Sequence, residues 1–373
     1  MTGELFLYRS VAMVDLAQIR ENYRIYRTHL SEKRIISVIK ANAYGHGDIE
    51  VAKALAQEGA DFFAVSNINE GIRLRESAIT GEILILGYTP TELSHLVSKY
   101  NLSQAIVSEE HLAEALTDKN RRIKYPIAVD VGMRRIGLCP ERVLTDIKNA
   151  SEILKINGIF THLPVADVPD SESVEYTQSE IDVFDAICRE AERFGVELFH
   201  CQNSAAATSY SSKKSNCARM GISLYGYAPS SEVVLPSGVM PALEWKSMIC
   251  RVFSVKKGES IGYGRSFFAQ KDMTVATVTT GYADGYPRAL SNRGYVIIKG
   301  EMCRVVGRVC MDMMMVDVSS VHDVKAGEEV VLLGHSGEKQ VSADDIARWA
   351  DTIPYEILTR ISSRVARQYI DGK

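Results

Sequence analysis

The stretch RIISVIKANAYGHG, residues 34–47, contains the first of the segments that decide the fold. It begins as a run of apolar and β-branched residues, which is typical of a buried strand. The run ends at Lys40, and small residues, Tyr44 and two glycines follow. A charged amine at the end of a buried strand must be paired, lose its proton or be used covalently. Lys40 is therefore the first candidate for chemistry in this chain.

Seven more runs of this kind follow along the chain. Amphipathic stretches separate several of them, for example DIEVAKALAQEGA (48–60) and YTQSEIDVFDAICREAERFG (176–195). Eight strands that alternate with helices predict a (β/α)8 TIM-type barrel. An open, doubly wound sheet fits less well, because no glycine-rich dinucleotide fingerprint follows the first strand. The seven runs are FFAVSN (62–67), EILILG (82–87), QAIVS (104–108), YPIAVDV (125–131), INGIFTHL (156–163), ELFHCQNS (197–204) and CARMGISLYG (217–226).

The pattern changes after about residue 235. Short apolar runs such as MTVATVTTGYADG (273–285) are separated by glycine-rich turns, which predicts an all-β domain. A length of 373 residues also favours two domains. We therefore predict a cofactor-binding barrel over residues 10–236 and a β domain over residues 237–373, with residues 1–15 as a segment that could pair with the β domain. A helical tail over residues 342–369, with Ser342 as its N-cap, closes the chain.

Composition and charge exclude several classes of protein. A net charge of −4 and a pI near 6.1 give no electrostatic footprint for nucleic acid. Seven cysteines without a C-x-x-C pair indicate reduced thiols rather than disulfides or a metal site. The N-terminus lacks the basic region of a signal peptide, and no run reaches the roughly 18 apolar residues of a membrane span. We expect a cytoplasmic protein without membrane contact of its own, which could also be the cytoplasmic domain of a membrane-anchored protein.

Polar side chains gather where the predicted barrel strands end, which is where barrels carry their chemistry. A lysine, two arginines and a histidine at one mouth suggest a planar, anionic cofactor with a phosphate. A buried lysine with a lowered pKa also suits Schiff-base chemistry, and pyridoxal 5′-phosphate is the cofactor that needs both features. The residues at the strand ends are Lys40, Arg135, His162, Asn203, Ser204, Arg219, Gly221 and Ile222.

Several motifs resemble those of the alanine racemase family, in the same order along the chain. The cofactor-lysine motif is VIKANAYGHG around Lys40, and HCQNSAA and RMGISLYG follow in the barrel. The β domain adds IGYGRSFFA around Tyr263, GYADGYPRALSNRG, GRVCMDMMMVDV and TIPYEILTRISSRV. The resemblance runs from about residue 10 to residue 370.

The resemblance implies a barrel followed by a β domain, in a head-to-tail homodimer with shared active sites. Lys40 would hold pyridoxal phosphate covalently and act as the base for D-alanine. Tyr263 would arrive from the partner subunit and act as the base for L-alanine. Two bases on opposite faces of a planar carbon are what racemisation needs. The implied activity is pyridoxal-phosphate-dependent interconversion of L- and D-alanine, which supplies D-alanine for peptidoglycan.

The resemblance also implies roles for the other residues. Arg219 would contact the pyridine nitrogen, and His162 would pack against the ring face. Arg135 and the backbone of Met311 would meet the substrate carboxylate. Further cofactor contacts, mainly to the phosphate, would come from Tyr44, Asn203, Ser204, Gly221, Ile222 and Tyr355. The positions that match the family's entrance corridor are Tyr282, Arg288, Arg308, Asp312 and Asp167.

The sequence departs from the family pattern near the substrate. Ala128 stands where the family usually has a lysine, often carbamylated, seven residues before the carboxylate-binding Arg135. Leu163–Val165 also differ from the usual residues. A serine racemase, or a dual serine/alanine racemase of the vancomycin-resistance type, is therefore an alternative.

Two other functions and several simpler interpretations of single residues stay open. A non-catalytic pyridoxal-phosphate-binding protein would not need Tyr263, and a decarboxylase on the same plan would place an acidic group rather than Arg219 at the ring nitrogen. Taken alone, Lys40 could be a strand-end lysine that reaches solvent and His162 a core histidine. Met313–Met315 are expected to be plain core of the β domain.

Overall fold

The computed structural model describes residues 9–372, and the chain divides into two compact units. The barrel unit consists of Gln18–Ala43 and Asp48–Pro241. The β unit consists of the described residues up to Ala17, the short segment Tyr44–Gly47, and the described residues from Ala242 onward. Neither unit is continuous in the sequence. Residues 1–8 of the predicted pairing segment lie outside the described residues.

All eight predicted strands occur in the barrel unit, and every pairing between them is parallel. Five strands lie in the order β5-β4-β3-β2-β9 and three in the order β6-β7-β8. Two contacts join these sheets at their ends. A parallel bridge between Ile106 and Ile127 connects the β5 segment to β6. The Arg219 N–H of β9 donates to the Gln202 carbonyl oxygen, which follows β8, at 3.0 Å. The (β/α)8 prediction is confirmed. The bounds are β2 Arg34–Val38, β3 Phe62–Val65, β4 Glu82–Ile85, β5 Ser103–Gln104, β6 Ile127–Ala128, β7 Gly158–Phe160, β8 Leu198–His200 and β9 Cys217–Met220.

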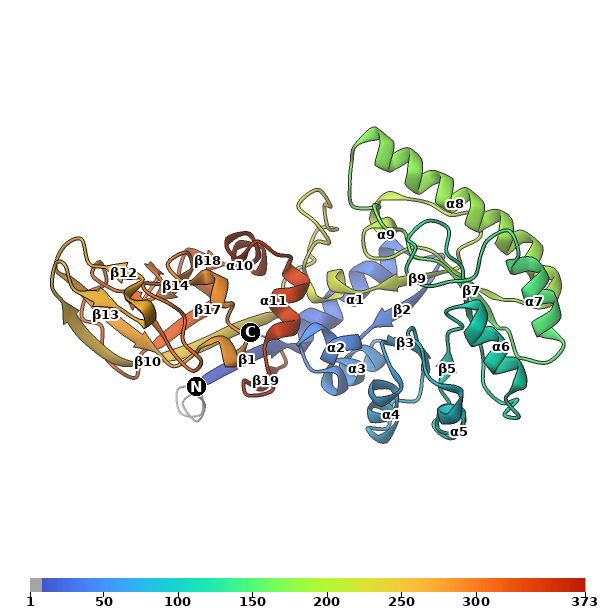
Figure 1. Ribbon diagram of the computed structural model, residues 1–373, viewed down its shortest axis with the longest axis horizontal. Helices are drawn as coiled ribbons and strands as arrows, with labels where there is room; N and C mark the ends of the chain where they lie inside the picture. The colour runs from blue at the N-terminus through green and yellow to red at the C-terminus, as the bar shows by residue number, and fades with distance from the viewer. Residues whose placement is uncertain (1–8, 373) are drawn as a thin grey trace. The chain divides into compact units, whose positions relative to one another are not determined.

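Helices surround the strands of the barrel unit (Figure 1). Side-chain caps fix several of their starts: Asn67 accepts from the backbone N–H of Glu70 at 3.2 Å, and Ser108 accepts from that of His111 at 3.2 Å. The longest helix, α8, begins after the capping residue Asp170. The helices are α1 Leu16–His29, α3 Asp48–Gln57, α4 Ile68–Glu76, α5 Ser94–Lys99, α6 Glu109–Thr117, α7 Val143–Ser151, α8 Ser171–Ala191 and α9 Ala206–Ser209. Within residues 9–372, no helix is both long and apolar enough to cross a membrane.

The β unit is built on a nine-stranded sheet whose main path runs β15-β14-β17-β10-β1-β19. Strand β10 is its longest member and buries alternate residues at its start, including Leu243, Trp245 and Ser247. This alternation is the period-2 pattern that the sequence shows. The strands are β1 Ser10–Asp15, β10 Leu243–Val255, β13 Met273–Val278, β14 Tyr295–Ile298, β15 Glu301–Arg304, β16 Met314–Asp317, β17 Glu329–Ser336, β18 Lys339–Val341 and β19 Ala366–Ile370, with β11 Ser260–Ile261 and β12 Phe267–Phe268 as a separate hairpin.

Strand β1 lies between two strands that are far from it in sequence. It pairs antiparallel with β10, with Ser10 opposite Ser247, and parallel with β19. The prediction of a helical tail to residue 369 is therefore wrong in its last part. Helices α10 (Ala343–Ala350) and α11 (Pro354–Arg360) form as expected, and Ser342 makes the predicted capping box. Residues 366–370 become β19 because tertiary pairing with β1 overrides the local helical preference.

The methionine run of the β unit is only partly core. Met314 begins β16 and is fully buried, whereas Met313 is 44% exposed. The prediction that Met313 belongs to the core is wrong, because this residue precedes the strand and lies in the loop that carries Met311.

Candidate functional site

Lys40 stands at the C-terminal end of β2, at the mouth of the barrel. Burial lowers the pKa of its amine, and the positive charges of Arg135 and then Arg219 lower it further. The carboxylate of Glu70 opposes this shift to a smaller degree. An amine with a lowered pKa is more often unprotonated, which is the form that attacks a carbonyl carbon or accepts a proton. This environment suits the Lys40 amine to covalent or base chemistry rather than to ion pairing.

A left-handed turn follows Lys40 directly. Ala41, Asn42, Ala43 and Tyr44 have φ values of 52°, 56°, 51° and 52°, although none of them is glycine. Each such residue costs about 1–2 kcal/mol relative to the right-handed form. Hydrogen bonds hold the turn: the Ala41 N–H donates to a Glu70 carboxylate oxygen at 2.8 Å, and the Ala43 N–H donates to the Ile39 carbonyl oxygen at 2.9 Å. Backbone strain of this kind concentrates at functional sites.

Arg219 lies in β9 and is 5% exposed. Its guanidinium donates to the carbonyl oxygens of His200 at 2.5 Å and Thr161 at 2.6 Å, and to Nδ1 of His200 at 2.8 Å. Burial lowers its pKa to about 10, so the group remains charged near neutral pH. None of its hydrogen bonds within the described part of the chain goes to a carboxylate. Arg219 is thus a buried cation that is held by carbonyls and imidazole.

His162 follows β7 and lies close to Arg219, whose nitrogen is 3.4 Å from Nδ1 of the imidazole. Burial lowers the pKa of His162 to about 3, and the positive charges of Arg219, Arg135 and Lys40 contribute to the shift. The ring is therefore neutral near neutral pH, which suits packing against an aromatic face. The electrostatic effects connect Lys40, Arg135, His162 and Arg219, so the barrel brings these four predicted residues together.

The loops after β8 and β9 form a second part of the barrel mouth. Ser204 is buried, and its hydroxyl oxygen accepts from the Gly221 N–H at 3.0 Å. Ile222 begins a short 3₁₀ helix, Ile222–Tyr225. The side-chain oxygen of Asn203 accepts from the Ala206 N–H at 2.9 Å and thereby shapes this loop. Hydroxyl and backbone N–H groups of this kind can bind an anion.

Arg135 lies in the loop after β6 and is exposed. Within residues 9–372, no hydrogen bond or ion pair ties its guanidinium to another side chain. Ala128, where the family usually has a lysine, is 2% exposed and offers no charge to Arg135. The guanidinium is therefore free to bind a carboxylate.

The β unit carries the remaining predicted residues. The rings of Tyr44 and Tyr355 lie 5.9 Å apart, and burial, followed by the nearby Tyr355, raises the pKa of the Tyr44 hydroxyl. Tyr44 therefore keeps its proton and can donate a hydrogen bond. The loop of Tyr282 meets that of Met311, because the Ala283 N–H donates to the Met311 carbonyl oxygen at 2.9 Å.

The predicted corridor residues occupy both units. Asp312 forms an ion pair with Arg364 at 2.6 Å in the β unit. Arg308 and Arg288 are exposed in the same unit. Asp167 lies in the barrel unit, where its carbonyl oxygen accepts from the Ser230 hydroxyl at 3.0 Å.

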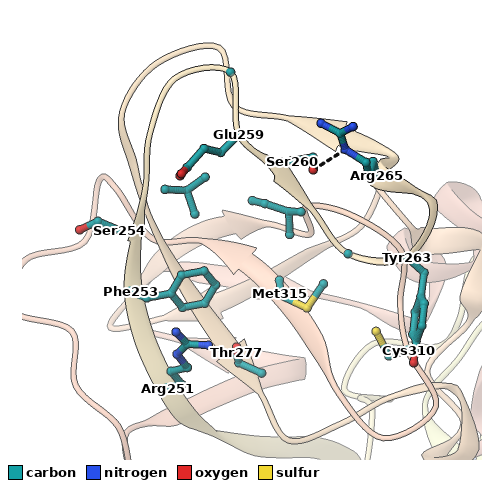
Figure 2. A pocket seen from close by; sticks show the side chains of 14 residues that line it. Arg251, Phe253, Ser254, Glu259, Ser260, Tyr263, Arg265, Thr277, Cys310 and Met315 are labelled. Carbon is teal, nitrogen blue, oxygen red and sulfur yellow. Dashed lines mark hydrogen bonds between the residues drawn. The ribbon is translucent and has the colours of Figure 1, made fainter.

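Tyr263 begins the 3₁₀ helix Tyr263–Arg265 and is 70% exposed. It lines an open pocket with a volume of about 960 Å³. Figure 2 shows Tyr263 and Cys310 at the same end of this pocket, away from Ser254 and Glu259. Gly264, beside Tyr263, has a φ of 67°, and a Cβ there would lie 3.1 Å from the Arg308 guanidinium carbon. The phenol of Tyr263 is exposed, and the left-handed Gly264 fixes the loop that carries it, so this hydroxyl can contact a molecule outside its own unit.

Sequence reasoning missed two sets of residues. His200 supports Arg219 from the end of β8, and a histidine after the apolar residues that begin the run ELFHCQNS was a visible signal. Glu180 of α8 is a buried acid, and its pKa is raised by the half-buried Asp130 of the Arg135 loop. No sequence signal marked Glu180, because a glutamate in an amphipathic helix is usually at the surface.

Comparison with known proteins gives full-length similarities. The chain matches the family description "Alanine racemase, N-terminal domain" over residues 14–229 and "Alanine racemase, C-terminal domain" over residues 242–369. It is 38% identical to a Clostridium acetobutylicum protein named alanine racemase 1, over 96% of this chain and 95% of that protein. A solved alanine racemase structure from Clostridium difficile matches with a TM-score of 0.89 and 35% identity, covering 98% of this chain and 97% of that one. An alanine racemase from Bartonella henselae, solved with covalently bound pyridoxal phosphate, matches with a TM-score of 0.86 and 28% identity over 97% of this chain and 99% of that one.

Proposed function

Because this chain belongs to the alanine racemase family, we propose that it interconverts L- and D-alanine. The observation that carries the proposal is Lys40: its amine, with a lowered pKa, ends a barrel strand next to the cations Arg135 and Arg219. Lysine in this state is a base, and the two arginines suit anionic groups of a cofactor and an amino acid. The names of the full-length relatives favour alanine as the substrate and do not favour the serine alternative.

The residues at the barrel mouth fit pyridoxal phosphate. The Lys40 amine can form the covalent link, and the hydroxyl of Ser204 lies beside the N–H of Gly221, where a phosphate could be held. When bound, pyridoxal phosphate supplies an electron sink that makes the substrate Cα–H acidic. Asn203, Ile222, Tyr44 and Tyr355 are proposed as further cofactor contacts. Their donor groups, a side-chain amide, a backbone N–H and two phenols, suit phosphate oxygens.

Arg219 determines which kind of ring nitrogen fits beside it. Its guanidinium remains charged near neutral pH, so it donates hydrogen bonds and accepts none. An unprotonated ring nitrogen is the matching acceptor. The absence of a carboxylate from its hydrogen bonds within the described residues argues against the decarboxylase alternative. His162, which is neutral near neutral pH, is proposed to pack on the ring face.

Two bases are proposed to move the proton. The Lys40 Nζ removes the Cα proton of D-alanine, and the Tyr263 Oη removes that of L-alanine. After one base has removed a proton from one face of the carbon, the other base delivers a proton to the opposite face, which inverts the carbon. Arg135, together with the backbone of Met311, binds the substrate carboxylate, and Tyr282 lies on the substrate's path. We propose that Tyr263 acts on the site of a partner subunit in a head-to-tail homodimer, which its 70% exposure supports.

The proposed location is the cytoplasm, and the cysteines support it. All seven are free thiols in the structure, as is usual for proteins of a reducing compartment.

The first experiment measures racemisation of L-alanine and L-serine by the enzyme loaded with pyridoxal phosphate, with kcat/KM for each. We expect alanine to be turned over faster than serine. Tyr263→Phe should lower L-to-D conversion by about 10²–10⁴-fold and leave the visible absorbance of the bound cofactor unchanged. Tyr88→Phe, at another exposed tyrosine, is the control. A loaded protein that turns over neither amino acid would overturn the proposal.

A mixing experiment tests the shared site. Lys40→Ala and Tyr263→Phe are each expected to be inactive alone. If each site combines Lys40 of one subunit with Tyr263 of the other, a mixed dimer has one intact site and one doubly altered site. Random mixing should then restore about a quarter of the wild-type activity. No restoration, in a mixture shown to exchange subunits, would contradict the head-to-tail dimer.

A further inference from the structure

The loop after β6 carries Arg135, and Asp130 organises its first turn. An Asp130 carboxylate oxygen accepts from the backbone N–H groups of Gly132 at 3.1 Å and Arg134 at 2.9 Å. The Leu138 N–H donates to the Ala128 carbonyl oxygen at 2.8 Å and closes the loop. Arg134, the residue before Arg135, has a φ of 57°. The direction in which Arg135 leaves the backbone therefore depends on this turn.

Helix α8 packs two side chains against the same turn. A Cβ on Gly132 would lie 2.1 Å from Oε1 of Glu180 and 2.3 Å from the hydroxyl oxygen of Tyr176, so any larger residue there would have to displace both groups. The Tyr176 hydroxyl also donates to the Gly132 carbonyl oxygen at 3.3 Å. Glu180 and Tyr176 are four residues apart and so lie on one face of the helix. The backbone of the Arg135 loop thus rests directly on α8.

Glu180 is an unusual residue to find at this contact. It is 2% exposed, and neither carboxylate oxygen makes a hydrogen bond of regular geometry within residues 9–372, although the Tyr176 hydroxyl lies close enough to lower the pKa of the carboxyl group to a smaller degree. Burial, and next the negative charge of Asp130, raise the pKa of Glu180 to about 7. Asp130 from the loop and Tyr176 from the helix itself are the titratable groups that act on it. A buried acid without a counter-charge is costly for stability, and neither the fold nor the proposed chemistry accounts for it.

We propose that Glu180 is a positioning residue for substrate binding: its buried carboxyl group, packed against Gly132, fixes the turn that presents Arg135 to the carboxylate of alanine. Glu180 acts through the loop and touches neither substrate nor cofactor. With its proton, Glu180 is a neutral group near the charge of Asp130, and the turn is undisturbed. Without its proton, it places a second negative charge beside Asp130 and repels the turn. The inference rests on the proposed function, because it assigns Arg135 to the substrate carboxylate.

The test compares Glu180→Ala with Glu180→Gln, and with the exposed Glu175→Ala and Glu175→Gln of the same helix as controls. In Glu180→Ala we expect the KM for both enantiomers of alanine to rise about tenfold while kcat changes much less, because a loosened loop misplaces Arg135. Glu180→Gln keeps a neutral group of the same shape and should restore KM. As the pH rises above 7, the Glu180 carboxyl loses its proton in the wild type, and the KM of the wild type should rise. The KM of Glu180→Gln should not show this rise, because its amide does not ionise. The Glu175 variants should match the wild type.

A second measurement does not depend on activity. The backbone N–H groups of Gly132 and Arg134 should exchange with solvent faster in Glu180→Ala than in the wild type or Glu175→Ala. Unchanged exchange together with unchanged KM would overturn the inference, as would a loss of kcat at constant KM. If Glu180→Ala does not fold, identical pH profiles of KM in the wild type and Glu180→Gln would overturn it. A wild-type enzyme that does not turn over alanine would instead count against the proposed function, and the exchange measurement would still decide the role of Glu180 in the loop.

Discussion

Replacing His200 by glutamine should have an effect on stability that depends on pH in a calculable way. His200 is 1% exposed, and its ring stacks on Phe160 with centroids 5.0 Å apart and an angle of 9° between the planes. Nδ1 accepts a hydrogen bond from Arg219 at 2.8 Å, so this nitrogen carries no proton. Burial, and next the charge of Arg219, hold the pKa of His200 well below its usual 6.5.

The size of the effect follows from linkage between protonation and folding. The native pKa is depressed, so the contribution of neutral His200 to stability is present above pH 6.5 and is lost as the pH falls. At pH 5 the imidazole of residue 200 is protonated in the unfolded chain but neutral in the native state. Because pH 5 lies about 1.5 units below the pKa of the unfolded chain, at 1.36 kcal/mol per unit, the free energy of unfolding of the wild type falls by about 2 kcal/mol. Glutamine does not titrate. At pH 7 the variant should be less stable by about 1–3 kcal/mol, because the imidazole that stacks on Phe160 and whose Nδ1 accepts from Arg219 is lost. Between pH 7 and pH 5 that deficit should shrink by about 2 kcal/mol.

Urea unfolding at pH 7, 6 and 5 measures this deficit. Far-UV circular dichroism mainly follows the barrel helices, whereas Trp245 and Trp349, the two tryptophans of the chain, both report on the β unit. The effect should appear in the circular dichroism transition. His29→Gln, at an exposed histidine at the end of α1, is the matched control and should show no such change. A deficit for His200→Gln that stays constant from pH 7 to pH 5 would refute the reasoning.

Three further substitutions test single contacts. Ser342→Ala removes the cap that accepts from the Asp345 N–H at 3.0 Å, and should cost about 1 kcal/mol, seen as a small drop in Tm; an unchanged Tm would contradict it. Asn22→Ala removes three hydrogen bonds that its buried amide makes to backbone atoms and should cost about 3 kcal/mol in urea unfolding, whereas a cost below about 1 kcal/mol would show that these bonds contribute little. Gly45→Ala would put a Cβ 2.2 Å from the Leu358 carbonyl oxygen at a φ of 86°, so we expect poor soluble yield or a much lower Tm; a wild-type melting curve would rule out that geometry.

The fold was largely predictable because its signals are local. The eight runs that alternate with helices predict the barrel, even though β5 and β6 are only two residues long in the structure. The run lengths overestimate these strands because apolar residues continue into the buried loops behind them. Strand β19 was not predictable, since residues 366–370 owe their conformation to pairing with β1 at the other end of the chain.

The site was predictable where chemistry and position coincide. Lys40 and Arg219 are unusual residues in apolar runs, and barrel geometry predicts that their strand ends meet. The structure adds what spacing cannot give: the neutral state of His162, the support of Arg219 by His200, and the burial of Glu180. Each of these depends on packing between segments that are distant in sequence.

The position of β1 in the sheet has a consequence for synthesis on the ribosome. Ser10 is opposite Ser247, so the first partner of β1 is made 237 residues later (247 − 10). At a translation rate of about 5–20 residues per second, this strand waits roughly 12–47 s with its edges unpaired. Its other partner, β19, is made later still. During that interval the barrel segments can fold, while the SVAMVD strand is exposed to chaperones and to mispairing with other nascent chains.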